Sequence, residues 1–257
     1  MTRMSIPTFS DTVTRFWARP FEGTELFRDE RLSLISNPGL GAGERVTLLR
    51  TAGDHHTAVA VRPEIAEQLR SRGVGTGASV LSEPQLRRAL SDLGILLHDA
   101  DNVFYFPAGH PAREGLAEAG DGYVVRVLTA ADSGLFADFT QRASEQDLDD
   151  AQVELEDWAV CGVIAPSGAP NGSRDRLVAA ASTYPWRDSR LADIGVLTLA
   201  TERGKGHGRR LVTAMARHAL EQDHELQYRC QLDNAGSNAL AHAAGLQLWG
   251  RWEVPTP

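Results

Sequence analysis

The sequence of 257 residues is poor in lysine, in cysteine and in long apolar runs. Lys205 is the one lysine, so the basic side chains are almost all arginine. The two cysteines, Cys161 and Cys230, lie in strand-like runs, which favours buried thiols in a reducing compartment over a disulfide framework or a catalytic thiol. No apolar run approaches the ~18 residues of a membrane span, and the first residues lack the apolar stretch of a signal peptide. We therefore expect a cytoplasmic protein without a membrane partner.

Positive charge is also scarce. The chain has 34 acidic residues against 26 lysines and arginines, which gives a net charge of −8. Nucleic-acid binding generally requires a basic surface, so we expect no nucleic-acid partner. The pair His55 and His56 has no cysteine or spaced histidine nearby, so we expect no metal site.

One segment gathers positive charge in this acidic chain. Residues 203–210 read Arg-Gly-Lys-Gly-His-Gly-Arg-Arg, directly before an amphipathic helical pattern. Cations at a helix N-terminus are unfavourable, because the helix dipole already places partial positive charge there. Their clustering is explained if an anion binds between them, and glycines let the backbone approach a phosphate closely. A solvated basic turn is the alternative reading.

The surroundings of this segment narrow the interpretation. Residues 193–200 are apolar and β-branched and predict a buried strand, so the unit is strand, glycine-rich loop, helix. No Gly-Lys-Ser/Thr follows, so the loop is not a Walker motif that would serve magnesium. The glycine spacing does not match the dinucleotide-binding fingerprint either.

The loop resembles the Arg/Gln-x-x-Gly-x-Gly/Ala signature of the GNAT superfamily of acyl-CoA-dependent N-acetyltransferases. A second segment, which begins at Asn234 and continues through Ser237 to Gly245, is similar to the Asn-x-x-Ser/Ala…Gly-Phe segment of that family. The two motifs occur in the family's order and spacing. The resemblance covers about residues 122–257. It implies an α+β fold, with a mixed central sheet flanked by helices and the order β-α-α-β-β-β-α-β-α-β.

The resemblance also implies where acetyl-CoA, the acyl donor, would bind. In the family the sheet splays beside the motif strand, and the pantetheine arm pairs with the freed backbone. An amide near Leu197 would polarise the thioester carbonyl, with no metal and no covalent enzyme intermediate. The residues that would bind the donor are Leu197, Thr198, Leu199, Arg203, Gly204, Lys205, Gly206, His207, Gly208, Arg209, Asn234 and Ser237.

The acid and the base are less clearly indicated. The tyrosine that protonates the leaving thiolate in many family members is replaced by Ala241, and Ser237 is the candidate donor in its place. Asp193 lies near the family's carboxylate position, which Ala192 itself occupies, so Asp193 would face the other side of the sheet. Glu156 and Asp157 are rival bases. Ser237 and Asn234 also fit purely structural roles as helix-capping residues.

The N-terminal half carries no comparable motif. Residues 31–35, 45–49, 57–61 and 102–106 predict strands, and residues 63–72 and 83–93 predict helices. Turn-forming residues between 107 and 122 indicate a division into an N-terminal α+β domain at 1–110 and a GNAT-like domain at 122–257. Whether the first domain is a degenerate GNAT-like half stays open.

We therefore expect an N-acetyltransferase that acts on a primary amine of a small molecule or peptide. A non-catalytic acyl-CoA-binding or regulatory protein is the alternative, and transfer of a longer acyl group is a third option. Residues 145–155 predict an acidic amphipathic helix. Residues 145–157 hold seven acidic residues and no basic one, which indicates either a solvated helix face or a wall that attracts a cationic acceptor. A homodimer is the assembly that we consider.

Overall fold

The computed structural model describes residues 8–75, 81–110, 122–165 and 175–256. The chain forms two compact units, one from residues 1–104, 230–234 and 248–257, the other from residues 105–229 and 235–247. The sequence indicated a single division between residues 110 and 122, and residues 111–121 of that segment lie outside the described residues. The two units are discontinuous in sequence, because residues 248–257 join the first unit.

The first unit is built on a mixed sheet whose strands run in the order β1-β2-β4-β3-β11-β5. Strand β2 pairs parallel with β4, whereas β1/β2, β3/β4 and β3/β11 are antiparallel. Its elements are α1 (Asp11–Ala18), η1 (Arg19–Phe21), β1 (Thr24–Arg28), β2 (Leu32–Ser36), η2 (Ala42–Glu44), β3 (Val46–Thr51), β4 (Thr57–Val61), α2 (Pro63–Ser71), α3 (Glu83–Asp92), most of β5 (Asp101–Tyr105) and most of β11 (Gln247–Glu253).

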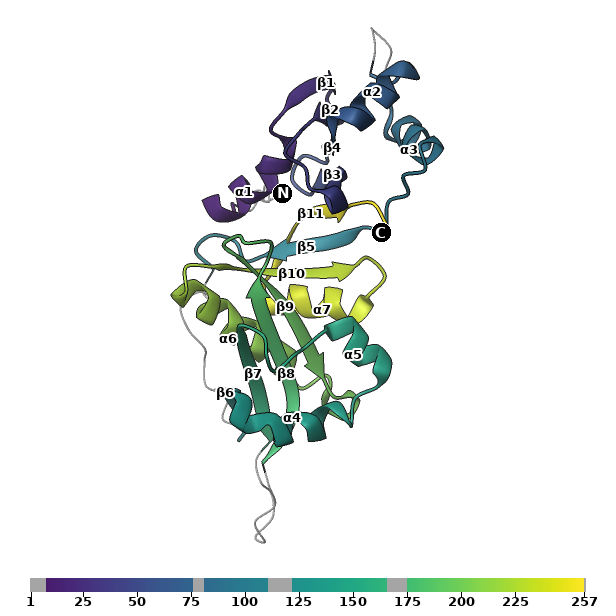
Figure 1. Cartoon of the computed structure of the whole chain (residues 1–257). Coiled ribbons are helices and arrows are strands. Elements are labelled where there is room, and N and C mark those ends of the chain that lie inside the picture. The colour runs from purple at the N-terminus through teal and green to yellow at the C-terminus, as the bar shows by residue number, and fades with distance from the viewer. Residues whose placement is uncertain (1–7, 76–80, 111–121, 166–174, 257) are drawn as a thin grey trace, which may run out of the picture. The chain divides into compact units, whose positions relative to one another are not determined.

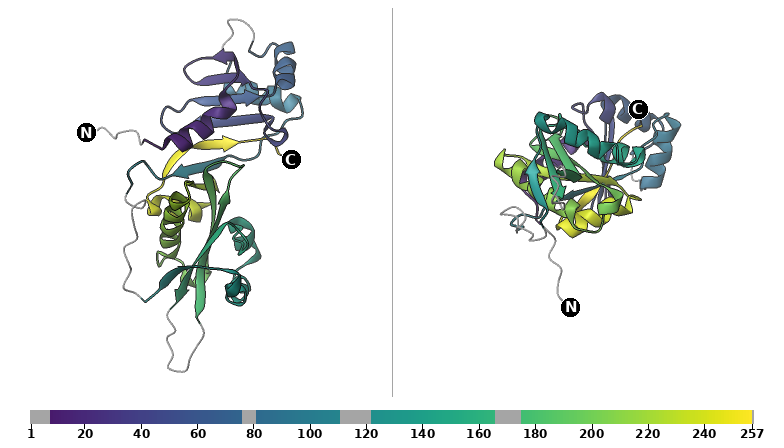
Figure 2. Two further views of the ribbon diagram at one scale, coloured as in Figure 1. Left: turned by 60° about the vertical axis from the view of Figure 1, so that its left-hand side comes forward. Right: turned by 90° about the horizontal axis from the view of Figure 1, so that it is seen from below.

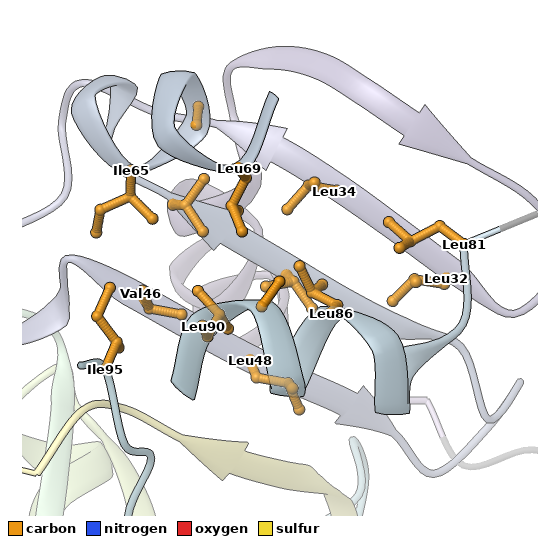
Figure 3. Close-up of a cluster of buried hydrophobic side chains, with 14 residues drawn as sticks. Leu32, Leu34, Val46, Leu48, Ile65, Leu69, Leu81, Leu86, Leu90 and Ile95 are labelled. Atoms are coloured by element: carbon orange, nitrogen blue, oxygen red, sulfur yellow. The ribbon is translucent and has the colours of Figure 1, made fainter. Parts of the chain in front are cut away.

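Helices α2 and α3 cover one face of this sheet. Leu34 and Leu48 on the strands pack with Leu69 of α2 and with Leu86 and Leu90 of α3, as Figure 3 shows. Each of these five side chains is almost fully buried, and burying a leucine typically contributes about 1.5–3 kcal/mol. The strands and helices that were expected here are present, within one or two residues of their predicted positions.

The opposite face of the sheet is covered by α1, which was not predicted. Ser10 caps this helix by accepting a hydrogen bond from the Val13 amide, and Val13 and Trp17 are its buried residues. The Trp17 ring lies 6.0 Å from the ring of Trp252 on β11. Apolar residues four apart behind a serine cap are a weak signal, since two buried side chains are too few to reveal a helical period.

The second unit is a mixed sheet between two layers of helices (Figure 2). Its strands run in the order β10-β9-β8-β7-β6, all antiparallel except the parallel pair β9/β10. The elements are β6 (Val124–Val127), η4 (Ala130–Asp132), α4 (Ser133–Thr140), α5 (Glu145–Ala151), β7 (Ala159–Ala165), β8 (Arg176–Pro185), β9 (Leu191–Thr198), η5 (Ala200–Glu202), α6 (His207–Glu221), β10 (Glu225–Gln231) and α7 (Ala235–Ala244).

Helix α6 contacts β7, β8 and β9 and packs beside α7, while α4 contacts β8 and α5 contacts β9 on the other side (Figures 1 and 2). The order of elements along the chain confirms the predicted β-α-α-β-β-β-α-β-α-β sequence and the α+β class. Among the described residues, no helix combines the length and the apolar character needed to cross a bilayer.

The acidic helix expected over 145–155 is shorter than predicted and ends at Ala151. The chain turns out of the helix because Gln152 adopts a left-handed conformation, with φ of 46°. The Glu154 amide then donates to the Ser182 hydroxyl on β8 at 3.2 Å. Residues 152–157 therefore form a loop against β8 rather than further helical turns.

Both cysteines are free and buried, as expected. Burial raises the pKa of Cys161 to about 11 and that of Cys230 to about 12. Both therefore remain neutral thiols near pH 7, which is poor chemistry for a nucleophile.

Candidate active site

The glycine-rich loop joins the end of β9 to the start of α6, and two of its glycines adopt a left-handed backbone. Gly204 has φ of 78° and Gly206 has φ of 80°, a region that other residues rarely occupy. A Cβ at either position would meet no atom within 4 Å. Backbone conformation rather than crowding therefore requires glycine here, and the space outside the loop stays open to a ligand.

The loop ends in the N-terminus of a 15-residue helix. Gly206 is the N-cap of α6, and the Arg210 amide donates to the Gly206 carbonyl at 3.2 Å. The amides before Arg210 have no intrahelical acceptor, as at every helix N-terminus. They point outward with the positive end of the helix dipole, which suits an anion such as a phosphate.

The third glycine of the motif has a different role. A Cβ on Gly208 would lie 3.0 and 3.1 Å from the two terminal carbons of Leu240 on α7. Such contacts are too tight for an alanine without a shift of the neighbour. Gly208 therefore lets α6 and α7 pack closely, in addition to offering its amide in the first helical turn.

Two of the expected cationic side chains already have acidic partners. The Lys205 ammonium lies 2.7 Å from Glu202, and the Arg203 guanidinium lies 2.6 Å from Asp147 of α5. Arg203 also donates through Nε to the Thr198 carbonyl at 3.2 Å. These ion pairs and this hydrogen bond therefore fix the conformation of the loop. Arg209 is exposed at the first turn of α6.

Glu202 was missed by the sequence reasoning, although it is buried beside the loop and binds Lys205 together with two residues from outside the loop. It is only 5% exposed and accepts hydrogen bonds from Lys205, from Arg176 at 3.0 Å and from Tyr123 at 3.4 Å. The Lys205 hydrogen bond, with smaller contributions from nearby positive charge, keeps its pKa below the usual value. A glutamate next to three polar loop residues carries no sequence signal of burial.

His207 points into the protein. It is 1% exposed, and its ring centre lies 4.5 Å from that of Tyr123. Of the groups that His207 carries, only the backbone amide is placed to serve a ligand outside the loop.

The sheet opens beside the loop. Strands β9 and β10 are in parallel register from Leu191↔Glu225 to Asp193↔Gln227, and the register ends there. Strand β9 continues for five more residues to Thr198 while β10 diverges, as Figure 1 shows. The splay expected beside the motif strand is therefore present in the structure, on the side of β9 that leads to the glycine loop.

The hydrogen bonds of β9 decide which amides face this opening. The Leu199 amide donates to the Val178 carbonyl on β8 at 3.1 Å. In an antiparallel pair, alternate residues bond to the same neighbour, so Leu197 also points its amide to β8. Val196 and Thr198 point theirs away from β8, toward the opening. Val196 was not singled out from the sequence, because this alternation follows from the register.

Asp193 lies at the point where β9 and β10 part. It is 6% exposed and accepts a hydrogen bond from Gln227 at 3.0 Å. It also forms an ion pair with Arg229 at 2.6 Å. Gln227 in turn accepts a hydrogen bond from the Tyr105 hydroxyl. The carboxylate thus links the two strands at the vertex of the splay.

The other acidic candidates lie in the loop before β7. Glu156 is exposed, whereas Asp157 accepts a hydrogen bond from Ser182 at 2.5 Å. Ala159, Thr183 and Ile194 lie in one row across β7, β8 and β9. The loop therefore reaches the end of the sheet at which Asp193 stands.

Helix α7 carries the second motif. Ser237 lies in its first turn and is partly buried, and Ala241 is completely buried. Alanine at this position fills a packed site where a tyrosine side chain would not fit without rearrangement. Asn234 directly precedes α7, and its predicted role stays a prediction. Within the described residues, no cluster of three or more potential metal ligands is present.

Comparison with known proteins identifies this part of the chain. Residues 132–246 match the model of the acetyltransferase (GNAT) family. This match confirms the resemblance of the motifs and assigns a GNAT acetyltransferase domain to residues 132–246. No curated protein sequence matches the chain significantly.

Several solved structures are similar to this chain. A GCN5-related N-acetyltransferase from Sphaerobacter thermophilus superposes with a TM-score of 0.50 at 15% identity, over 84% of this chain and 81% of that protein. A GNAT-family protein from Novosphingobium aromaticivorans has a TM-score of 0.41 at 17% identity, with 63% of this chain and 65% of that one covered. The chain thus spans slightly less than two thirds of that relative. A Salmonella typhimurium protein, solved with its cofactor acetyl-CoA, has a TM-score of 0.39 at 16% identity, over 53% and 94%.

Proposed function

We propose that this protein transfers an acetyl group from acetyl-CoA to a primary amine, by direct attack within a ternary complex. The observation that carries the proposal is the opening between β9 and β10, which leads to a helix N-terminus preceded by left-handed glycines. An extended arm that ends in phosphates fits an open strand edge followed by an anion-binding helix end.

The donor-binding residues follow from this geometry. The amides of Val196 and Thr198 would pair with the pantetheine arm, and the amides of Gly206, Gly208 and Arg209 would hold the pyrophosphate. Acetyl-CoA supplies an activated thioester, so no further cofactor is needed for the reaction. Because Leu199 donates to Val178, we transfer the strand-pairing role from Leu197 and Leu199 to Val196 and Thr198.

The Val196 amide is the group that we assign to the thioester carbonyl. It lies on the strand edge that faces the opening and is fixed by the β8 pairing on its other side. A fixed donor of this kind stabilises negative charge that develops on the carbonyl oxygen, an effect typically worth about 3–4 kcal/mol. The remaining work is proton transfer, from the amine and to the thiolate.

Glu156 is the base that we favour. A base must be open to the substrate, and Glu156 is exposed, with no recorded hydrogen bond or ion pair to another described residue. Asp193 is buried and bound by Arg229, which ties up its oxygens. Ser237, in the first turn of α7, is the proposed proton donor to the leaving thiolate.

The acceptor is a primary amine of a small molecule or peptide, and we propose that it is cationic. Asp149, Asp150, Glu154 and Glu156 are exposed on α5 and the loop after it. Within the described part of the chain, Asp147 is the acidic residue of this segment that pairs with an arginine. Acidic groups in this position would raise the local concentration of a positively charged amine.

A non-catalytic acyl-CoA-binding protein remains the second candidate. It is favoured by the engaged Asp193 and by the buried Ala241 in place of a tyrosine. The two functions share the donor site and differ in turnover. Release of free thiol from acetyl-CoA across a panel of polyamines, aminoglycosides and basic peptides supports the enzyme, and binding without thiol release supports the alternative.

The donor site is tested first by calorimetry with acetyl-CoA. We expect Gly206→Asp to abolish binding, because a carboxylate at this position repels the pyrophosphate and strains the left-handed backbone. Gly94→Asp is the matched control, since Gly94 has φ of 73° and open surroundings, yet lies at the end of α3 in the first unit. Equal acetyl-CoA affinity of folded Gly206→Asp and Gly94→Asp proteins would refute the donor site.

A further inference from the structure

The first unit contains a cavity of about 700 Å³ that the acetyl-transfer site does not use. It is bounded by the turn before β2, the β3–β4 turn, the start of α3, and β11. Its volume lies within the ~300–1,000 Å³ typical of small-molecule sites. Most of its lining side chains are charged, and both signs are present, so the cavity suits a ligand that carries both a positive and a negative group.

Two arginines stand side by side on the cavity wall. Arg251 of β11 is directly opposite Arg50 of β3, and Arg50 is opposite Thr57 of β4. Side chains at such opposed positions lie on the same face of a sheet, and like charges there destabilise the pairing. An anion between the two guanidiniums would remove this repulsion.

The neighbouring ion pairs leave Arg251 without a carboxylate. Glu253 pairs with Arg87 at 2.7 Å, Arg87 pairs with Glu83 at 2.9 Å, and Glu83 also binds Arg50. Two carboxylates thus balance two guanidiniums within this chain of contacts. Among the described residues, the recorded side-chain partner of Arg251 is the neutral amide of Asn102, at 3.3 Å from Nε. Its terminal nitrogens remain available to an oxyanion.

Acidic groups line the cavity beside the turns. Asp29 accepts the Arg31 and Leu32 amides at 2.8 and 2.7 Å, and Asp54 accepts the His56 amide at 3.0 Å and the Thr51 hydroxyl. These bonds all reach Oδ1, and within the described part of the chain no partner is recorded for either Oδ2.

Both carboxylates are held in their charged form. Backbone hydrogen bonds, first from Arg31 and then from Leu32, lower the pKa of Asp29. The Thr51 hydroxyl, followed by the His56 amide, lowers the pKa of Asp54. Each therefore offers a charged oxygen to a cation near neutral pH.

We propose that this cavity binds a small zwitterion of the amino-acid class. Its carboxylate binds Arg251 and Arg50, and its ammonium group binds Oδ2 of both Asp29 and Asp54. Leu32 and Leu81, which Figure 3 labels, add an apolar part of the wall to receive the ligand's carbon atoms. A dianion such as phosphate fits less well, because the acidic residues of the cavity would repel its second charge.

The probes are the twenty protein amino acids, γ-aminobutyrate and 5-aminovalerate, which separate the two charges further, and inorganic phosphate as a control dianion. Binding to the full chain is measured by ligand-observed NMR and calorimetry, without acetyl-CoA. We expect at least one of these amino acids to bind, and its N-acetylated and carboxamide derivatives, which lack one charge, to bind at least about tenfold more weakly.

Substitutions of cavity residues test whether the ligand binds in this cavity. Arg251→Gln and Asp54→Asn should each weaken binding about tenfold or more, whereas Arg28→Gln, which alters an exposed ion pair on β1, should leave it unchanged. Acetyl-CoA affinity should be the same in all three variants, so the result is independent of the proposed transferase activity. The proposal is overturned if no probe binds at about 10 mM, well above a Kd of ~1 mM, if Arg251→Gln and Asp54→Asn both leave binding intact, or if inorganic phosphate is the only probe that binds.

Discussion

Replacing Asp193 by asparagine tests whether this carboxylate is a structural link or a catalytic base. The substitution keeps the size of the side chain and removes its charge. Arg229 then loses its counter-ion at 2.6 Å, while Gln227 keeps an acceptor at 3.0 Å. Asparagine would also place an amide group where Arg229 needs an acceptor.

The expected loss of stability follows from the burial of the pair. Removing one partner of a buried ion pair typically costs about 3–5 kcal/mol. Asp193 is 9% exposed and Arg229 is 23% exposed at the side chain, so water partly solvates the guanidinium and the lower end applies, about 3 kcal/mol. For a protein of this size that corresponds to a fall in Tm of roughly 6–12 °C.

The assay is a double-mutant cycle of Asp193→Asn and Arg229→Met, measured by thermal and urea unfolding. We expect a coupling free energy of at least about 1.5 kcal/mol, because either single change already breaks the pair. Effects that add within about 0.5 kcal/mol would refute the ion pair as the link between β9 and β10. A large loss of kcat with unchanged Tm would instead identify Asp193 as the base.

Three further changes test the site and the fold. Ser237→Ala should lower kcat more than acetyl-CoA affinity, because a proton donor acts mainly in the transition state; an equal loss would make Ser237 a binding residue. The kcat/KM for a cationic acceptor should fall with ionic strength, and Glu154→Gln with Glu156→Gln should flatten that dependence; a salt-independent kcat/KM contradicts the cationic acceptor. Arg126, followed by the Thr129 amide, lowers the pKa of Asp132 to about 2, so its stabilising effect is present above the ordinary value of 3.8 and is lost as the pH falls toward 2. Asp132→Asn should therefore reduce the change in Tm between about pH 5 and 2, and an unchanged pH profile would contradict this.

The pattern of neighbouring residues in the sequence predicted most of the helices and strands, and also the glycine-rich loop of the donor site. Alternating apolar residues located the strands, and the glycines between β9 and α6 marked the donor site, since both signals lie within a few neighbouring residues. Pairing across the fold could not be predicted in the same way. Arg229 lies 36 residues after Asp193, and the alternation that selects Val196 depends on the β8–β9 register.

The same limit applies to charged side chains. The sequence offered Lys205 as a phosphate ligand, whereas in the structure it binds Glu202, three residues earlier. The acidic run before β7 read as one long helix, because nothing local marks Gln152 as left-handed. The cavity of the first unit draws on four separate segments, which no single stretch of sequence brings together.

The place of β11 has a consequence for how the chain folds as it is synthesised. Residues 248–253 of this strand lie between β3 and β5 in the sheet of the first unit, although more than a hundred residues separate them from β5 in the sequence. A nascent chain that has emerged only to residue 110 lacks this inner strand, and β3 and β5 then have no common neighbour to pair with. The first unit therefore completes its sheet only after the whole acetyltransferase domain has left the ribosome, so the part of the protein that is made first is among the last to be finished.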